Sequence, residues 1–326
     1  MQTLYPLAFH TIFKDKIWGG EKIRSILHKD FAPLPNCGET WEISGVKGNE
    51  SVVKNGPLAG HSLPELIGRF GGQLVGQRVY ERFGSEFPLL LKFIDANDDL
   101  SVQVHPNDEL ARKRHNSFGK TEMWYIIQAD EGASLISGFN RPLDRDTYLH
   151  YFEQNRLFDI LNREPARAGD VFFLPAGRVH TIGKGLLLAE IQQTSDITYR
   201  IYDFDRTDAQ GNKRELHLEQ ALDAIDYTYY ESYKTHYEPR VDAPVELVSC
   251  PYFTTNRLHA RHTMVRNYAG LDSFVVYMCL QGGFELAWQG GSMPVRLGDS
   301  ILLPASIEQV ELRPQGEFNA LEAYVP

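Results

Sequence analysis

An eight-residue segment that occurs twice constrains this chain more than any other feature. Residues 169–176 read GDVFFLPA, and residues 298–305 read GDSILLPA. Each copy has a Gly-Asp pair, a short apolar run and a proline, which is the pattern of a strand bounded by turns. The repeat predicts two copies of one β unit. Five positions beyond the proline lies His180 in the first copy and Gln309 in the second, so we expect a strong metal ligand only in the first.

The composition around the repeat is typical of a mainly β protein. Aromatic residues make up 12% of the chain, and many short apolar runs end at one of its 27 glycines or 17 prolines. Such runs indicate strands separated by turns. Helices are expected only in pieces, at residues 62–75, 107–114 and 144–163, where capping residues or helical apolar spacing favour them.

The repeat also predicts two domains, and a polar stretch at residues 227–244 marks the boundary between them. This stretch is rich in tyrosine and contains prolines, and the apolar periodicity that lapses there resumes at Val245. Composition shifts of this kind are common at domain boundaries. We therefore expect a front domain over residues 1–240 and a C-terminal β domain without metal ligands over residues 241–326.

Charge and cysteine content exclude several classes of protein. A formal net charge of -10 repels polyanions, so we expect no nucleic-acid partner, and an anionic substrate would need local cations. No run of about eighteen apolar residues predicts a membrane span. Cys37, Cys250 and Cys279 are too few and too scattered for a disulfide framework, which favours a cytoplasmic protein.

Three separate segments carry candidate metal ligands. In residues 99–105, Gln103 and His105 alternate with apolar residues, so both side chains share one face of a strand and can reach one ion. A second candidate strand, residues 120–127, places Lys120 and Glu122 on one parity. The turn-rich motif at residues 169–180 presents His180 at the start of a further strand. Imidazole, amide and carboxylate groups together suit Zn²⁺ or a similar divalent metal.

Polar residues also occupy every second position from Glu190 to Arg200. A polar strand face inside a barrel needs partners, because burying unpaired polar groups costs roughly 2–7 kcal/mol each. If this face points inward, it lines a wet, functional cavity. Taken singly, these residues have plainer interpretations: Asp196 and Arg200 as an exposed ion pair, Lys120 as a solvent-facing residue, and Lys92 as a charged residue on an edge strand.

The order of these segments resembles that of the type I phosphomannose isomerases, members of the cupin superfamily, and especially their short bacterial form. The resemblance implies two cupin-type β-barrels, also called double-stranded β-helices or jelly rolls, and the interconversion of mannose 6-phosphate and fructose 6-phosphate. The segments that carry it are residues 18–21, 39–44, 101–108, 119–125, 169–180 and 190–203.

The same resemblance implies a site with one zinc ion per chain. Arg200 would act in catalysis, with Lys120 and Asp196 beside the hexose phosphate, and the catalytic base stays open among Lys120, Asp196 and a metal-bound water. The implied metal ligands are Gln103, His105, Glu122 and His180.

Two other functions fit the same pattern of ligands. Another metal-dependent cupin, such as a dioxygenase, would use similar side chains, and a non-catalytic sugar-binding cupin module would use the polar strand only to hold its ligand. The chain is expected to act as a monomer or a homodimer, and zinc is not distinguished from other divalent metals by ligand type.

Overall fold

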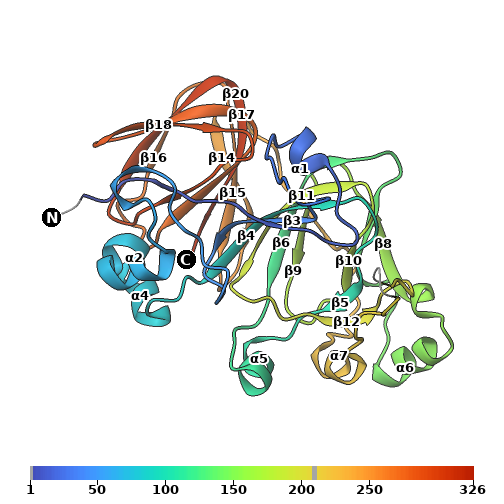
Figure 1. The fold of residues 1–326 in the computed structure, drawn as a ribbon. Helices are drawn as coiled ribbons and strands as arrows, with labels where there is room; N and C mark the ends of the chain where they lie inside the picture. The colour runs from blue at the N-terminus through green and yellow to red at the C-terminus, as the bar shows by residue number, and fades with distance from the viewer. Residues whose placement is uncertain (1–2, 208–210) are drawn as a thin grey trace.

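Three antiparallel β-sheets form the body of the molecule (Figure 1). The structure is a computed structural model that describes residues 3–207 and 211–326. Two of the sheets belong to the front part of the chain and enclose one barrel, which we call the front barrel. Its seven-stranded sheet runs in the order β13 (Lys234–Thr235), β9 (Val171–Leu174), β6 (Glu122–Ala129), β11 (Leu186–Gln193), β4 (Leu89–Ala96), β3 (Glu39–Ser44) and β2 (Ile12–Lys14).

The second sheet of the front barrel has five strands and faces the first. His180 of this sheet and Glu122 of the seven-stranded sheet come within 3.3 Å of each other, which shows that the two sheets turn these side chains toward a common interior. The strand order is β12 (Tyr199–Tyr202), β5 (Val102–Val104), β10 (His180–Ile182), β7 (Ser134–Phe139) and β8 (Leu161–Pro165).

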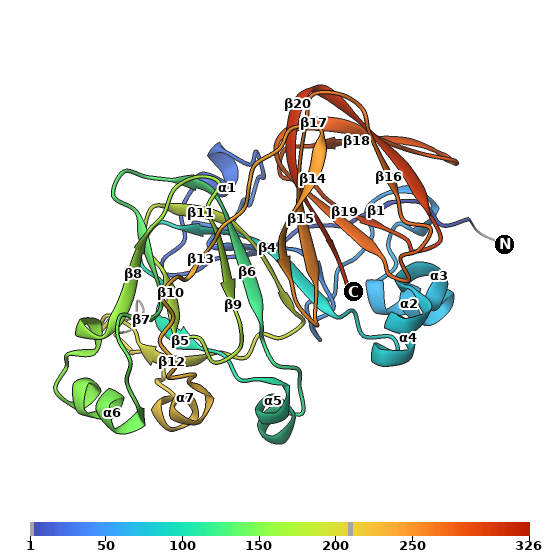
Figure 2. The same cartoon turned by 180° about the vertical axis from the view of Figure 1, so that it is seen from behind.

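The third sheet curls into the C-terminal barrel, which lies beside the front barrel in both views (Figures 1 and 2). A continuous apolar core fills it and includes Tyr277, Phe284 and Phe318. Its path runs β1 (Leu7–Ala8), β19 (Ser300–Leu303), β17 (Val275–Trp288), β20 (Gln309–Tyr324), β15 (Thr254–Ala260) and β14 (Ala243–Ser249), with β16 (Met264–Asn267) on β20 and β18 (Gly291–Arg296) on β17.

The sequence repeat corresponds to a repeat of strand pairing. In the front barrel β9 pairs with β6, β6 with β11, and β11 with β4; in the C-terminal barrel β19 pairs with β17, β17 with β20, and β20 with β15. His180 begins β10 and Gln309 begins β20. The prediction of a mainly β protein is confirmed, and the repeated pairing is consistent with two copies of one β unit.

Helices lie at the ends of the barrels and not between their sheets (Figure 1). Three of them, α5, α6 and α7, lie at one end of the front barrel, whereas α2 and α4 lie against the C-terminal barrel in both views. The helices are α1 (Lys22–Ser25), α2 (Leu63–Phe70), α3 (Gly72–Val75), α4 (Gln77–Phe83), α5 (Asp108–His115), α6 (Arg145–Glu153) and α7 (Leu218–Ala224), with 3-10 turns η1 (Gly56–Leu58) and η2 (Leu157–Asp159).

The predicted helix at residues 107–114 is confirmed, because Asn107 caps α5 by accepting a hydrogen bond of 2.9 Å from the backbone N–H of Leu110. The single helix predicted over residues 62–75 is wrong: Gly71, with φ of 51°, separates α2 from α3. The helix predicted over residues 144–163 ends at Glu153, and the chain continues through η2 into strand β8.

The two barrels share parts of the N-terminal chain. Strand β1 pairs with β19, so the first described strand of the chain belongs to the C-terminal sheet. The end of α3 is also tied to that barrel, because the carbonyl of Val75 accepts a 3.1 Å hydrogen bond from the N–H of Phe274. The division into residues 1–240 and 241–326 stays a prediction.

Phe274 provides a test of how much the packing of Phe274 against Phe87 contributes to the stability of the chain. Its ring lies 4.7 Å from that of Phe87, and both side chains are fully buried. Replacing a buried Phe by Ala removes apolar contacts and leaves a cavity, which costs about 3–5 kcal/mol. We expect Phe274→Ala to lower the free energy of unfolding by this amount in urea denaturation. The exposed Val265→Ala should change it by less than about 0.5 kcal/mol, and equal effects of the two would contradict the prediction.

Candidate metal centre and active-site cavity

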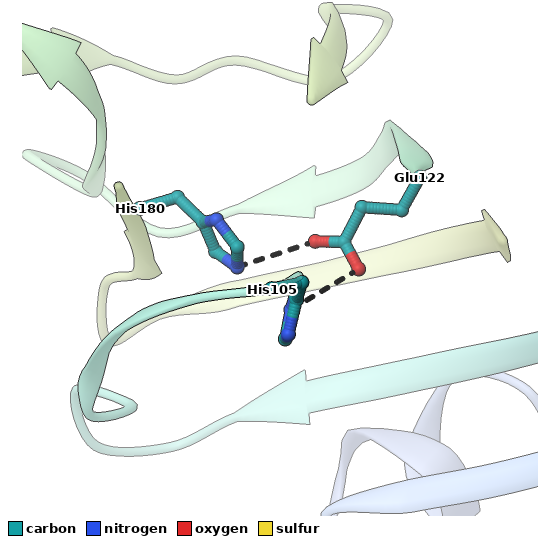
Figure 3. A group of neighbouring side chains, drawn as sticks. All are labelled: His105, Glu122 and His180. Carbon is teal, nitrogen blue, oxygen red and sulfur yellow. Dashed lines mark ion pairs between the residues drawn. The ribbon is translucent and has the colours of Figure 1, made fainter. Parts of the chain in front are cut away.

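Three side chains converge at the floor of the front barrel. His105, Glu122 and His180 are all buried, and one ligand atom from each lies within 4.8 Å of the others. Nε2 of His180 lies 3.3 Å from Oε1 of Glu122, and Nε2 of His105 lies 3.6 Å from Oε2. Figure 3 shows both imidazoles directed at the carboxylate.

Strand ends place these three groups. His105 directly follows β5, Glu122 begins β6, and His180 begins β10 after a turn that contains Gly177 with φ of 92°. The N–H of Gly177 donates a 2.9 Å hydrogen bond to the carbonyl of His105, which ties that turn to the end of β5. The register places Gln103 opposite His180. Ligands from distant parts of the sequence therefore meet because the strands that carry them are neighbours or face each other.

Backbone carbonyls orient both imidazoles. Nδ1 of His105 donates to the carbonyl of Ile197 at 2.8 Å, and Nδ1 of His180 donates to the carbonyl of Arg178 at 2.8 Å. A proton on Nδ1 leaves the lone pair of Nε2 able to bind a metal, although in His105 it accepts from the Lys120 ammonium at 3.0 Å. Burial, the Lys120 ammonium and the neighbouring imidazole hold the pKa of His105 well below its usual range, and burial lowers the pKa of His180 to about 3. Both rings are thus neutral, as metal ligands must be.

Among the described residues, the carboxylate of Glu122 has one cationic neighbour, the ammonium of Lys120. Within the described residues neither of its oxygens accepts a hydrogen bond of regular geometry, although the Lys120 ammonium lies 2.8 Å from Oε2. Burial, reinforced by the charge of Glu190, raises the pKa of Glu122 to about 7. A buried carboxylate beside two neutral imidazoles matches the ligand chemistry of Zn²⁺. The residues present therefore fit a divalent metal.

Gln103 lies at the edge of this group. Its Nε2 is 3.3 Å from Nε2 of His180, and its Oε1 accepts a 3.3 Å hydrogen bond from the hydroxyl of Ser101. Because the two ends of an amide are assigned from their surroundings, a metal would favour the orientation that presents the oxygen. Its role as a ligand stays a prediction.

A cavity of about 470 Å³ is lined by the four other predicted site residues, and two of them, Gln103 and Lys120, connect it to the imidazoles. Lys120 lies closest to the metal ligands, with its ammonium 3.0 Å from Nε2 of His105. The predicted residues that line this cavity are Gln103, Lys120, Asp196 and Arg200.

The interpretation of Asp196 and Arg200 as an ion pair is wrong. Among the residues that the structure describes, no ion pair joins them, and Nη1 of Arg200 instead donates a 2.9 Å hydrogen bond to the carbonyl of Glu215. Burial and the nearby Arg214 lower the pKa of Arg200. The register places Arg200 opposite Gln103, so the guanidinium stands two strands away from His180. Asp196 is exposed at the cavity.

The polar alternation from Glu190 to Arg200 is not one strand. It divides into β11 and β12, which belong to different sheets, and the chain crosses between them at residues 194–198. Both strands nevertheless contribute to one cavity. The expectation that this polar face lines a cavity is confirmed for Glu190 and Arg200. The two-residue period could not show that these residues lie on strands of two different sheets.

Lys92 and Glu190 form a second charged group, which the sequence pattern did not predict as a pair. Lys92 is only 6% exposed, so its interpretation as a charged edge residue is wrong; its Nζ lies 3.1 Å from Oε1 of Glu190 and 3.6 Å from Oε2 of Glu39. Trp124 donates a 2.8 Å hydrogen bond to Oε2 of Glu190. A single lysine within the apolar run of residues 88–94 was the available signal.

These charges compensate one another. Burial alone would raise the pKa of Glu39, but the ammonium groups of Lys92 and Lys16 outweigh it and lower that pKa to about 2. Burial likewise opposes ionisation of Glu190, and Lys92 and Lys120 again outweigh it, so its pKa is lowered. The cavity lining therefore contains ionised carboxylates, Glu39 and Glu190, at neutral pH.

Comparisons with known proteins agree with this geometry. Residues 7–129 match the family model for the phosphomannose isomerase type I catalytic domain. Mannose-6-phosphate isomerase ManA of Bacillus subtilis is 36% identical over 321 residues, which cover 97% of this chain and 98% of that protein. The mannose-6-phosphate isomerase of Streptococcus mutans is 36% identical over 313 residues, covering 93% of each chain.

The chain belongs to the type I phosphomannose isomerase family.

Solved structures extend the likeness to the whole fold of this family member. The crystal structure of the Bacillus subtilis mannose 6-phosphate isomerase superposes with a TM-score of 0.87 at 30% identity, over 98% of this chain and 99% of that one. A putative mannosephosphate isomerase from Archaeoglobus fulgidus shares the fold, with a TM-score of 0.79 at 20% identity over 98% of this chain and 97% of that one. The family suggested by the sequence motifs is confirmed.

The metal site of this family member can be tested directly. We expect His105→Ala to lose bound divalent metal, because one of three converging ligands is removed while the fold stays intact. Metal content by atomic emission, with circular dichroism and unfolding curves for the fold, measures both quantities. His10→Ala, an exposed histidine, is the matched control. Full metal occupancy in a folded His105→Ala protein would contradict the site.

Proposed function

We propose that this protein is a mannose-6-phosphate isomerase that interconverts mannose 6-phosphate and fructose 6-phosphate with a bound zinc ion. The observation that supports it most is the convergence of His105, Glu122 and His180 beside Lys120, which lines a cavity together with Arg200. Membership of the family at 36% identity over nearly the full chain adds independent support.

The metal would be held by His105, Glu122 and His180, with Gln103 as the fourth ligand. When bound, zinc supplies a Lewis acid that stabilises negative charge on the sugar oxygens during isomerisation. The side chains of the cavity transfer protons, orient the sugar phosphate and balance its negative charge.

The reaction moves a proton between C1 and C2 of the sugar while the two attached oxygens exchange carbonyl and hydroxyl character. Glu190 provides a buried, ionised carboxylate held by Lys92 and Trp124, and such a group can accept a proton. Lys120 provides an ammonium group that can donate one at the same end of the cavity. Arg200 offers a fixed positive charge to the developing enediolate in a partly dehydrated site.

Cations outnumber anions in the cavity, although the whole chain has a formal charge of -10. Six cationic residues line it against three carboxylates, so it attracts a phosphorylated sugar more than a neutral one. The cationic residues are Lys14, Lys16, Lys92, Lys120, Arg200 and Arg214, and the carboxylates are Glu39, Glu190 and Asp196.

The cell compartment and assembly belong to the proposal as well. No helix among the described residues is long and apolar enough to cross a membrane. Cys37, Cys250 and Cys279 are all free thiols, which is the usual state in a reducing cytoplasm. We place the enzyme there, as a monomer or homodimer without nucleic-acid partners.

The proposed activity has a direct assay. A coupled measurement of fructose 6-phosphate consumption should show isomerase activity that disappears on exhaustive chelation and returns with Zn²⁺. Parallel re-addition of Mn²⁺ and Co²⁺ ranks the metals. Full activity in metal-free protein would contradict the role of the metal, and oxygen consumption without isomerisation would favour a dioxygenase. Sugar phosphate binding without turnover would favour a non-catalytic module.

Arg200 provides a test of the catalytic assignment within this function. We expect Arg200→Ala to keep its metal but to lower kcat about 100-fold or more, because a preorganised positive charge near the reacting oxygens is lost. The exposed Arg240→Ala serves as control and should leave kcat unchanged. Near-normal turnover of Arg200→Ala would show that Arg200 acts only in structure.

A further inference from the structure

A short crossing segment connects the two sheets of the front barrel beside the metal centre. We call residues 193–197 the strap; it runs from the end of β11 to the residues just before β12. Because β11 belongs to the seven-stranded sheet and β12 to the five-stranded sheet, the strap spans the gap between them.

The strap makes two contacts with the site. The carbonyl of Ile197 accepts the 2.8 Å hydrogen bond from Nδ1 of His105, which selects the tautomer that leaves Nε2 free. Asp196 lines the active-site cavity. The position of the strap therefore determines the orientation of one metal ligand and the place of one cavity carboxylate.

Gln192 holds the strap from inside the barrel. Its side chain is fully buried, and its Nε2 donates hydrogen bonds of 2.7 Å to the carbonyl of Gln193 and 2.6 Å to the carbonyl of Ser195. Since carbonyls only accept hydrogen bonds, the amide must present its NH₂ end to them. The register places Gln192 directly opposite Glu122, so the anchor of the strap and the metal-ligand carboxylate stand on adjacent strands.

Backbone hydrogen bonds to neighbouring segments secure the beginning of the strap, and the bond from His105 holds its end. The N–H of Gln193 donates to the carbonyl of Thr121 at 3.1 Å, and the N–H of Thr194 donates to the carbonyl of Pro88 at 2.9 Å. Within the strap, the N–H of Ser195 donates a 2.8 Å hydrogen bond to the carbonyl of Gln193, and Ser195 Oγ accepts a long, 3.4 Å hydrogen bond from the N–H of Ile197. A second cavity, of about 680 Å³, is lined by residues 194–196, so the strap is not packed on that side. Gln192 thus carries much of the restraint on its middle.

We infer that Gln192 is a positioning residue of the metal centre, which acts through the strap to hold His105 in the metal-binding orientation and Asp196 at the cavity. This inference rests on the metal site of the proposed function. Among the described residues, the hydrogen bonds of the Gln192 side chain go to the strap and not to a metal ligand, and Gln192 does not line the cavity, so we expect its effect to pass through the backbone carbonyl of Ile197.

The test replaces Gln192 by Met, which has similar length but no N–H donors. Groups that orient a metal-binding histidine are worth about 10–100-fold in metal affinity, and we expect Gln192→Met to weaken Zn²⁺ binding about tenfold in a chelator competition. The visible spectrum of the Co²⁺-substituted protein should change, because the ligand geometry changes, and kcat should fall more than KM rises.

Thr40→Val is the matched control. Thr40 is fully buried on β3, and its hydroxyl accepts one hydrogen bond, from the N–H of Phe93, away from the strap. This variant also loses a buried hydrogen bond to the backbone, but it should keep the Zn²⁺ affinity and Co²⁺ spectrum of the unmutated protein. A purely structural effect of Gln192→Met would resemble this control.

The outcomes separate this inference from the proposed function. If the unmutated protein binds metal and isomerises, but Gln192→Met shows unchanged affinity, spectrum and kcat, the positioning role is overturned and the function stands. If the unmutated protein binds no metal, both are overturned. Should Gln192→Met not fold, Gln192→Asn, which keeps the amide but is one methylene shorter, replaces it; unchanged metal affinity in that variant would also overturn the role.

Discussion

The buried carboxylate of Glu122 is the constraint on which the rest of the site depends. It lies between two neutral imidazoles, and neither oxygen accepts a regular hydrogen bond from the described residues. An ionised carboxylate without such partners is costly in a low-dielectric interior. Lys120 offsets part of this cost, and a divalent cation would offset the remainder. The proposed requirement for metal follows from this arrangement of charges.

The C-terminal barrel carries a buried carboxylate at the place in the repeat that corresponds to Glu190. Glu190 on β11 pairs in register with Lys92 and Trp124; Glu322 on β20 pairs with Asn256 and Tyr277. Glu322 is fully buried, but Arg266 donates to both of its oxygens at 2.8 Å and Asn256 donates at 2.7 Å. Both copies of the unit thus pair this buried carboxylate with protein groups, but only the first has Glu122 beside it, and no cluster of potential metal ligands occurs in the C-terminal barrel among the described residues.

Much of the fold and site could be predicted from local pattern. Alternation placed Gln103 and His105 on one face, and the repeat placed His180 at a strand start, because side-chain direction in a strand depends only on parity. Secondary structure and burial were predicted less well where contacts between distant parts of the chain decide them. The apolar residues after Glu153 have helical spacing, yet η2 and β8 use them in the barrel core. Lys92 looked like a surface residue because its partners, Glu39 and Glu190, lie far away in sequence.

The amino-acid sequence by itself determined the class of fold, the family and the side chains capable of binding a metal, since each of these depends on residue type and local spacing. Only the tertiary structure decided which of them meet. Strand register sets His180 beside the strand that ends just before His105, the facing of the two sheets brings both to Glu122, and the crossing from β11 to β12 sets the carbonyl of Ile197 against His105. The physical reason is that strand pairing joins residues across any sequence separation. The residues around one strand do not indicate which distant strand will pair with it.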